Sequence, residues 1–343
     1  MSYPTYFHWL VNETSTTWWN DSADPAELDK AMTMEISGVT TNPILNARAI
    51  RSNPGHWDTA DATKGITDPE ERAQRLMSLV VRETAAKLEP VYRRTNGEHG
   101  YVCAQVNPSR AGERDPMFKM ALRFHALAPN IAVKLPVTAA GLDVLEECVS
   151  QGITVTGTVS FTVPQVLAVA ERHRLGSLRA VKNHITPGKC FAVVMVGRLD
   201  DYLREIAADA QANVLESDII QAGIAVVKRA YAIFLEREYQ AVLLPAALRG
   251  VNQMTELAGA RLVMSIHPKV QGMIQSGNLP REPRINIPVA ADVLARLNTL
   301  PEFVRAYEPD GLTPAEFAAF GLTQRTLASF IETGWLPLET YNA

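Results

Sequence analysis

The sequence has few cysteines and no long apolar run, and both absences narrow the class of protein. Its three cysteines, Cys103, Cys148 and Cys190, form no Cys-x-x-Cys pair. An odd number without paired spacing is typical of free thiols in a reducing compartment, so we expect a cytoplasmic protein. No run of roughly 18 apolar residues, the length that spans a bilayer, occurs, and residues 1–10 lack the basic and apolar segments of an export signal.

An excess of basic charge is also absent. The chain carries 33 Lys and Arg against 37 Asp and Glu, for a formal net charge of -4. Proteins that bind nucleic acid or anionic membranes need clustered basic residues, so neither partner is expected. No Gly-x-Gly-x-x-Gly segment follows a strand and no Gly-x-x-x-x-Gly-Lys-Ser/Thr segment occurs, which leaves nucleotide binding unsupported. The seven histidines show no metal-binding spacing either, so the expected partner is a small molecule.

What the sequence does contain is a regular alternation of short apolar runs and longer amphipathic stretches. This alternation is typical of a parallel sheet covered by helices, and eight units without a linker favour a closed (β/α)₈ TIM barrel, an α/β fold. The eight expected strands are residues 16–20, 37–41, 101–106, 131–135, 154–159, 191–196, 241–244 and 262–266.

Helices are expected between these runs and after the last one. Residues 70–87, 141–151 and 219–236 are amphipathic and long enough to cross from one parallel strand to the next. The polar stretch 51–68 is predicted to be a loop. Residues 289–343 contain helical patterns without strands. We therefore predict a barrel domain over residues 1–288 and a C-terminal helical extension, residues 289–343, packed on it.

Lys134 stands out because of its place in the fourth expected strand. Side chains in a barrel strand alternate between the interior and the helix layer, and Ile131, Val133 and Leu135 form one apolar face suited to the helices. Lys134 then points into the barrel. An ammonium withdrawn from water loses hydration, so its pKa falls and the neutral amine can attack a carbonyl. The alternative is an ordinary surface lysine with its charged end in water.

Polar side chains at the ends of four other strands fall on the same inner face. They are Asp21, Thr40, Asn42, Gln105, Thr156 and Thr158. By the same alternation Asn107, beyond the third strand, is also expected inside. Structural alternatives exist: Asp21 as a helix N-cap, Asn42 as a turn residue before Pro43, and Thr40 and Thr158 as strand residues bonded locally. Catalytic groups of barrels gather at the carboxyl ends of the strands, so together with Lys134 they predict an active site there.

Three motifs resemble the transaldolase family, including its fructose-6-phosphate aldolase branch. They are Gly-Val-Thr-Thr-Asn-Pro at 38–43, Val-Lys-Leu-Pro-Val-Thr-Ala-Ala-Gly-Leu at 133–142 and Val-Gly-Arg-Leu-Asp at 196–200. The resemblance extends from Trp18 to about His267. It implies a (β/α)₈ barrel without metal or organic cofactor, in which Lys134 forms a Schiff base with a ketose. The substrates it implies are ketoses and aldoses, commonly phosphorylated.

The same resemblance assigns a role to each site residue. Asp21 would exchange a proton with the C4 hydroxyl, Gln105 and Thr158 would hold a water, and the remaining residues would bind substrate. Those substrate-binding residues are Thr40, Asn42, Thr156, Met195, Arg198 and Arg249, of which the two arginines match the family's phosphate-binding pair. An arginine at a strand end can instead be a surface ion-pair partner.

Several positions depart from the family pattern. Gln105 matches the aldolase branch, where transaldolases usually have Glu, whereas Met195 is apolar like the transaldolase Phe and unlike the aldolase Tyr. Thr156 replaces an Asn, and Ala247 replaces a phosphate-binding Ser. Three readings stay open: transfer of a dihydroxyacetone unit, simple release of dihydroxyacetone, and a silent barrel that binds a sugar phosphate or a protein. Such barrels often form homo-oligomers, and the sequence leaves the oligomeric state open.

Overall fold

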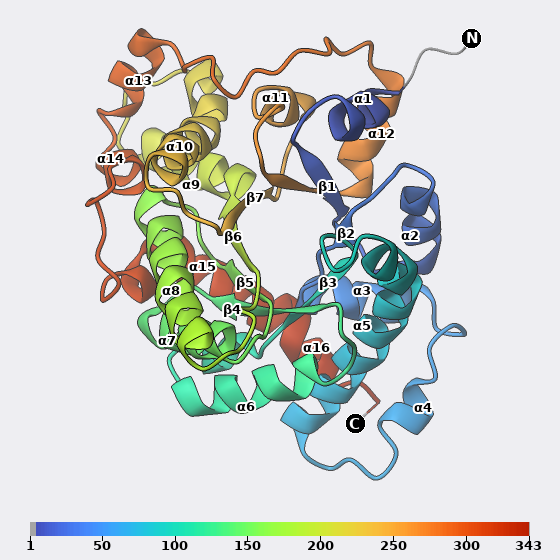
Figure 1. Ribbon diagram of the computed structural model, residues 1–343. Helices are drawn as coiled ribbons and strands as arrows, with labels where there is room; N and C mark the ends of the chain where they lie inside the picture. The colour runs from blue at the N-terminus through green and yellow to red at the C-terminus, as the bar shows by residue number, and fades with distance from the viewer. Residues whose placement is uncertain (1–4, 343) are drawn as a thin grey trace.

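The computed structural model describes residues 5–342. Residues 1–4 of the predicted barrel domain and residue 343 of the predicted extension lie outside the described residues. Eight parallel strands form one sheet in the order β7-β6-β5-β4-β3-β2-β1-β8. The two end strands, β7 and β8, contact one another, and the helices surround the resulting barrel (Figure 1). The predicted TIM-barrel fold is therefore confirmed.

Every predicted strand is present. The strands are β1 (Thr17–Asn20), β2 (Gly38–Val39), β3 (Tyr101–Gln105), β4 (Ile131–Pro136), β5 (Val155–Thr158), β6 (Cys190–Met195), β7 (Val242–Ala246) and β8 (Val263–Ile266). Each strand pairs with the preceding one in parallel, apart from β8, which pairs with β1. Pairing in parallel brings all eight carboxyl ends to the same face of the molecule.

Helices connect the strands where the amphipathic stretches predicted them. They are α1 (Tyr6–Asn12), α2 (Pro25–Met32), α3 (Pro43–Ser52), α4 (Thr59–Ala62), α5 (Pro69–Arg94), η1 (Pro108–Arg110), α6 (Arg114–His125), α7 (Ala139–Ser150), α8 (Val163–Lys182), α9 (Val196–Asp209), α10 (Glu216–Glu236), α11 (Val251–Thr255) and α12 (Pro268–Ser276). The segment 51–68, expected to be a loop, contains the end of α3 and the single turn α4. None of these described helices is long and apolar enough to cross a membrane.

The C-terminal region contains helices and no strand in its described part, as predicted. Its elements are α13 (Ala291–Leu297), α14 (Pro301–Tyr307), η2 (Phe317–Ala319), α15 (Gly321–Phe330), the π-helical turn η3 (Ile331–Trp335) and α16 (Leu336–Glu339). η3 packs against α3, and α16 packs against α5. Residues 331–339 thus return to helices of the first half of the barrel.

Several helices start with a side chain that caps them immediately after a strand. Asn42 accepts a hydrogen bond from the Leu45 N–H at the start of α3, and Thr138 accepts one from the Gly141 N–H at the start of α7. Such caps satisfy backbone donors that have no partner within the helix. The cap of α2 is Asp24, not Asp21. Asp21 is therefore left free of the structural role that the sequence had offered for it.

Aromatic rings fill the barrel interior near the amino-terminal ends of the strands. Trp19 and Phe191 lie on β1 and β6, which β7 and β8 separate, and their ring centroids are 4.6 Å apart across the interior. Tyr101 of β3 packs on Phe191 as well. Gly38 of β2 makes room for this cluster, because a Cβ there would lie 2.6 Å from the Trp19 indole. Trp19 and Phe191 also line a pocket of about 510 Å³ at this end, whereas Lys134 lines a pocket at the other end.

Candidate active site

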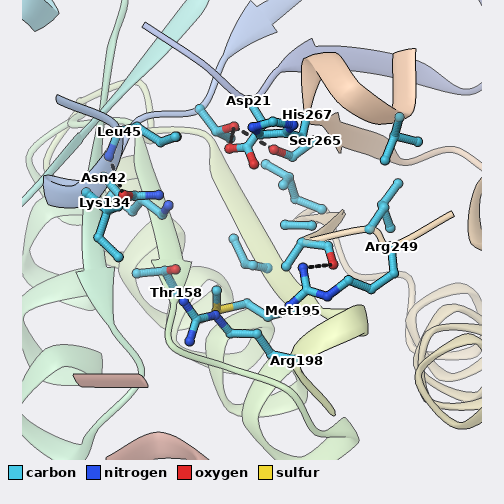
Figure 2. Close-up of a pocket in the computed structure, with 18 of the residues that line it drawn as sticks. Asp21, Asn42, Leu45, Lys134, Thr158, Met195, Arg198, Arg249, Ser265 and His267 are labelled. Carbon is cyan, nitrogen blue, oxygen red and sulfur yellow. Dashed lines mark hydrogen bonds between the residues drawn. The ribbon is translucent and has the colours of Figure 1, made fainter. Parts of the chain in front are cut away.

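A pocket of about 380 Å³ opens at the carboxyl ends of the strands. Figure 2 shows Asp21, Ser265 and His267 on one side of this pocket and the two arginines, Arg198 and Arg249, on the other. The residues that line it are Asp21, Thr40, Asn42, Ile44, Leu45, Lys134, Thr158, Val193, Met195, Arg198, Leu244, Ala246, Ala247, Leu248, Arg249, Ser265, His267, Lys269, Val270 and Phe330. Eight of the ten predicted site residues are among them; Gln105 and Thr156 are not.

Lys134 points from β4 into the pocket, as the alternation predicted. Its side chain is buried, with 6% of the residue exposed, and the amine donates a hydrogen bond to the Thr41 carbonyl oxygen at 3.2 Å. Burial lowers the pKa of Lys134, and the nearby Arg198 guanidinium adds to this shift. Cys103 and Asp21 oppose it. An amine with a lowered pKa is uncharged in a larger fraction of molecules, which is what attack on a carbonyl requires.

This lowered pKa predicts how activity depends on pH. If Lys134 is the neutral nucleophile that the family resemblance implies, ketose cleavage should rise about tenfold per pH unit below the pKa of the amine and level off above it. The measurement is kcat/KM between pH 5 and 10. A rate that still increases through pH 10 would place the pKa near the ordinary value of 10.5 and contradict the prediction.

Stability should respond to the same titration. Between the lowered pKa of folded Lys134 and 10.5, the unfolded chain binds a proton that the folded chain lacks, so the free energy of unfolding should rise with pH in this window. A Lys134→Met variant has no such group. The unfolding free energy of this variant minus that of the parent protein should therefore fall as pH increases, as measured by denaturant unfolding. A constant difference would count against the buried amine as its cause.

Asp21 lies just beyond β1, and two hydrogen-bonded hydroxyl groups hold its side chain in place. The Thr40 hydroxyl donates to the Asp21 carboxylate at 2.7 Å and lies 2.5 Å from the Ser265 hydroxyl oxygen. Among the described lining residues, Asp21 is the one carboxylate. It is therefore the carboxylate that the pocket offers to a bound molecule as an acid or base.

Two buried oxygens near Lys134 have no hydrogen-bond partner in the part of the chain that the structure describes. They are Oε1 of Gln105 and Oγ1 of Thr158. Gln105 on β3 is in register with Lys134, and Thr158 on β5 is in register with Pro136, two residues beyond it. A buried polar atom without a hydrogen bond lowers the stability of the fold by roughly 1–3 kcal/mol, so native proteins contain few of them. A water or a substrate hydroxyl beside the amine would satisfy both.

Three further predicted residues occupy different positions around the pocket. Thr156 lies below it, fully buried, with its hydroxyl 3.6 Å from the Cys103 sulfur. Asn42 lines the pocket, although its side-chain oxygen is already used to cap α3. Met195 lines the pocket at the end of β6. Asn107, expected inside, turns away because β3 ends at Gln105, and it bonds to Glu70 instead.

Arg198 and Arg249 approach the pocket from the first turn of α9 and from the loop after β7. Within residues 5–342 Arg198 has no hydrogen bond or ion pair, and its guanidinium carbon lies 5.4 Å from the Phe330 ring centroid. Arg249 pairs with Asp201 at 2.8 Å, which matches the ion-pair alternative, but it also lines the pocket. Burial and the charge of Arg249 lower the pKa of Arg198. Two neighbouring guanidinium groups, one unpaired, favour an anion between them.

Sequence reasoning missed Ser265 and Phe330. Ser265 carries the one hydroxyl in the apolar strand β8, so the alternation used for Lys134 would have pointed to it. Phe330 belongs to α15, far along the chain, and no local pattern connects it to the pocket. It is 1% exposed.

Phe330 should contribute strongly to stability. A Phe330→Ala variant is expected to lose roughly 3–5 kcal/mol of unfolding free energy, because it removes a large buried side chain and leaves a cavity. Chemical denaturation measures the loss. Leu336→Ala, in the same region but 43% exposed, should change stability by less than about 0.5 kcal/mol. Equal losses in the two variants would mean that the Phe330 site is not tightly packed.

Comparison with known proteins agrees with the predicted resemblance. The family model described as Transaldolase/Fructose-6-phosphate aldolase matches residues 18–300, which is most of the chain. The chain belongs to this family. The transaldolase of Thiobacillus denitrificans is 29% identical over 222 residues, which is 63% of this chain and 62% of that protein. Transaldolase 1 of Streptomyces avermitilis is 31% identical over 208 residues, 59% of this chain and 54% of the relative.

A third relative shows the same pattern of partial coverage. The transaldolase of Mycobacterium ulcerans is 28% identical over 214 residues, 60% of this chain and 56% of its own length. The matched part thus covers between half and two thirds of these transaldolases. The pocket residues from Asp21 to His267 all lie within the range of the family model, whereas Phe330 lies beyond it. Within the described chain, no group of three or more His, Cys, Asp or Glu residues could hold a metal ion.

Proposed function

We propose that this protein is a class I transaldolase that transfers a dihydroxyacetone unit from a ketose phosphate to an aldehyde through a Schiff base on Lys134. The observation that carries the proposal is a buried amine with a lowered pKa, facing a pocket whose lining includes Asp21. Membership of the family and the names of the relatives support it. Carbohydrate metabolism in the cytoplasm is the setting that we predict.

The first chemical step is the addition of neutral Lys134 to the C2 carbonyl of the ketose. A C–N bond forms, the carbonyl oxygen is protonated and leaves as water, and an iminium ion remains. The unpartnered oxygens of Gln105 and Thr158 are available to hold this water. Gln105 is an amide and takes no proton, so it orients the water without acting as its base.

Cleavage of the C3–C4 bond follows. Asp21 accepts the proton of the C4 hydroxyl, the C4 oxygen becomes the carbonyl of the released aldehyde, and the bonding electrons move into the iminium to give an enamine. Thr40 bonds to Asp21 and keeps the carboxylate in place. In transfer, the enamine carbon attacks a second aldehyde, Asp21 returns its proton to the new hydroxyl, and hydrolysis of the iminium releases the product.

Arg198 and Arg249 would hold the phosphate of the ketose or of the acceptor. Arg198 has no hydrogen-bond partner among the described residues, and Arg249 is anchored by Asp201 while still facing the pocket. Charge-assisted hydrogen bonds to phosphate are stronger than neutral ones, so this pair fixes the distance between the anion and the amine. The substrate class that fits is a phosphorylated ketose.

Borohydride reduction in the presence of fructose 6-phosphate, followed by peptide mass spectrometry, tests the Schiff base. A reduced adduct on the Lys134 peptide supports the proposal. No adduct with fructose 6-phosphate, other ketoses or dihydroxyacetone would favour a silent binding barrel. The second candidate is an aldolase that releases free dihydroxyacetone, and Gln105, the residue typical of that branch, favours it. Dihydroxyacetone release that does not depend on an acceptor aldehyde would identify this candidate and exclude transfer.

A further inference from the structure

A buried series of hydrogen bonds joins the two segments that carry Arg198 and Arg249. The Asp200 carboxylate of α9 accepts from the Gly223 N–H of α10 at 2.8 Å and from the Gln253 side-chain amide of α11 at 2.6 Å. The Gln253 side-chain oxygen in turn accepts from the Arg249 N–H at 2.6 Å. Asp200 and Gln253 are 1% and 2% exposed, so water does not compete for these bonds.

The two segments that these hydrogen bonds join, α9 and the loop after β7, are also in direct contact. A Cβ on Gly197 of α9 would lie 2.3 Å from the Ala247 carbonyl oxygen and 2.5 Å from the Arg249 Cγ, so the loop after β7 touches the backbone of α9. Ala247 has a positive φ of 55°, a left-handed conformation that surrounding structure must maintain in a residue other than glycine. A small shift in this loop would move Arg249 relative to Arg198.

We propose that Asp200 and Gln253 are positioning residues for the anion clamp formed by Arg198 and Arg249. This inference rests on the proposed function, because that function assigns the arginines to the substrate phosphate. Asp200 follows Arg198 by two residues on α9, and Gln253 bonds the backbone of Arg249 itself. The hydrogen bonds from Asp200 through Gln253 to Arg249 therefore hold the loop after β7 in place. The Arg249 guanidinium is thereby kept at a fixed position relative to that of Arg198.

The pattern of donors and acceptors explains why residue 200 is a carboxylate. Gly223 and Arg249 supply backbone N–H groups at the two ends of the series, and neither can become an acceptor. All three bonds then form only if residue 200 accepts on both of its oxygens. Burial raises the pKa of the Asp200 carboxyl to about 7, while the bonds from Gly223 and Gln253 oppose the shift by favouring the ionised form.

Two variants interrupt the series in different ways. Asp200→Asn places an amide NH₂ opposite the Gly223 N–H or the Gln253 amide, where two donors meet. Gln253→Met keeps the approximate shape of the side chain and removes both of its hydrogen bonds. Asp209→Asn makes the same chemical change at an exposed position of α9 and serves as the matched control.

The test compares a charged and an uncharged ligand. For fructose 6-phosphate, the concentration that half-saturates borohydride trapping on Lys134 should rise about tenfold in Asp200→Asn and in Gln253→Met, the loss expected for one weakened bond to a charged group. For dihydroxyacetone, which has no phosphate, it should stay the same. Asp209→Asn should match the parent protein with both ligands. A loss that merely reflects damaged folding would affect the two ketones alike.

Calorimetric titration with inorganic sulfate measures the clamp without any catalytic step. Sulfate affinity should fall about tenfold in both variants and remain unchanged in Asp209→Asn. The inference is overturned if sulfate does not bind the parent protein, if the two variants bind it as the parent does, or if trapping by dihydroxyacetone weakens as much as trapping by fructose 6-phosphate. Failure of trapping with every ketose, with sulfate binding still sensitive to Asp200 and Gln253, would reject the proposed function and retain the positioning role.

Discussion

Replacing Lys134 with Met is expected to abolish the borohydride-trapped adduct and to lower ketose cleavage by roughly 10³-fold or more. Met has no nucleophilic nitrogen, so neither the iminium nor the enamine can form, and the groups that remain can only bind the substrate. Its unbranched side chain fills much of the volume of the buried lysine, which has 6% of its surface exposed, and leaves no unpaired charge. Mass spectrometry and a coupled assay for the released aldehyde measure the two losses.

Lys269→Met is the control for this substitution. Lys269 also lines the pocket, but it is exposed at the start of α12. It should keep the adduct on residue 134 and most of the cleavage activity. If Lys134→Met retained an adduct, or if both variants lost activity equally, the amine of Lys134 would not be the nucleophile.

Asp21→Asn is expected to lower the rate of C3–C4 cleavage by roughly 10²–10⁴-fold, the usual contribution of a positioned general acid or base. An amide cannot take the proton of the C4 hydroxyl. Its oxygen can still accept the hydrogen bond from Thr40, which is 2.7 Å long in this structure, so the local geometry should survive. Single-turnover measurements of aldehyde release test the prediction.

The adduct separates a role in chemistry from a role in binding. Schiff-base formation with dihydroxyacetone needs no C3–C4 cleavage, so Asp21→Asn should still give the reduced adduct on Lys134. Asp29→Asn, which changes an exposed carboxylate paired with Lys87, should leave cleavage intact. A variant at Asp21 with normal cleavage would assign proton transfer to another group.

Much of the fold followed from local patterns. The eight strands occur within two residues of their predicted ends because parallel strands buried on both faces are short apolar runs, and these are easy to recognise between amphipathic helices. The inward position of Lys134 followed from the strict alternation of side chains along a strand. The boundary between barrel and extension stays a prediction.

The parts of the site that sequence did not predict depend on contacts between distant segments. Phe330 reaches Arg198 from α15, and Asp201 pairs with Arg249 across 48 positions of the chain. No periodicity encodes such pairs. The prediction that Asn107 points inward was wrong for a different reason. It extended the strand alternation past Gln105, where β3 ends, whereas Asn107 caps the short helix η1 that follows. The roles of the predicted residues remain proposals.

The aromatic packing of Trp19, Phe191 and Tyr101 affects how protons reach the amine. These rings close the lower end of the barrel, with 1%, 5% and 4% of each residue exposed. Lys134 lines the pocket at the other end, so under the proposed function its amine would exchange protons with solvent through the opening that admits the sugar. A bound ligand would then close this route, and the protons used during turnover would come from the water and side chains enclosed with the amine.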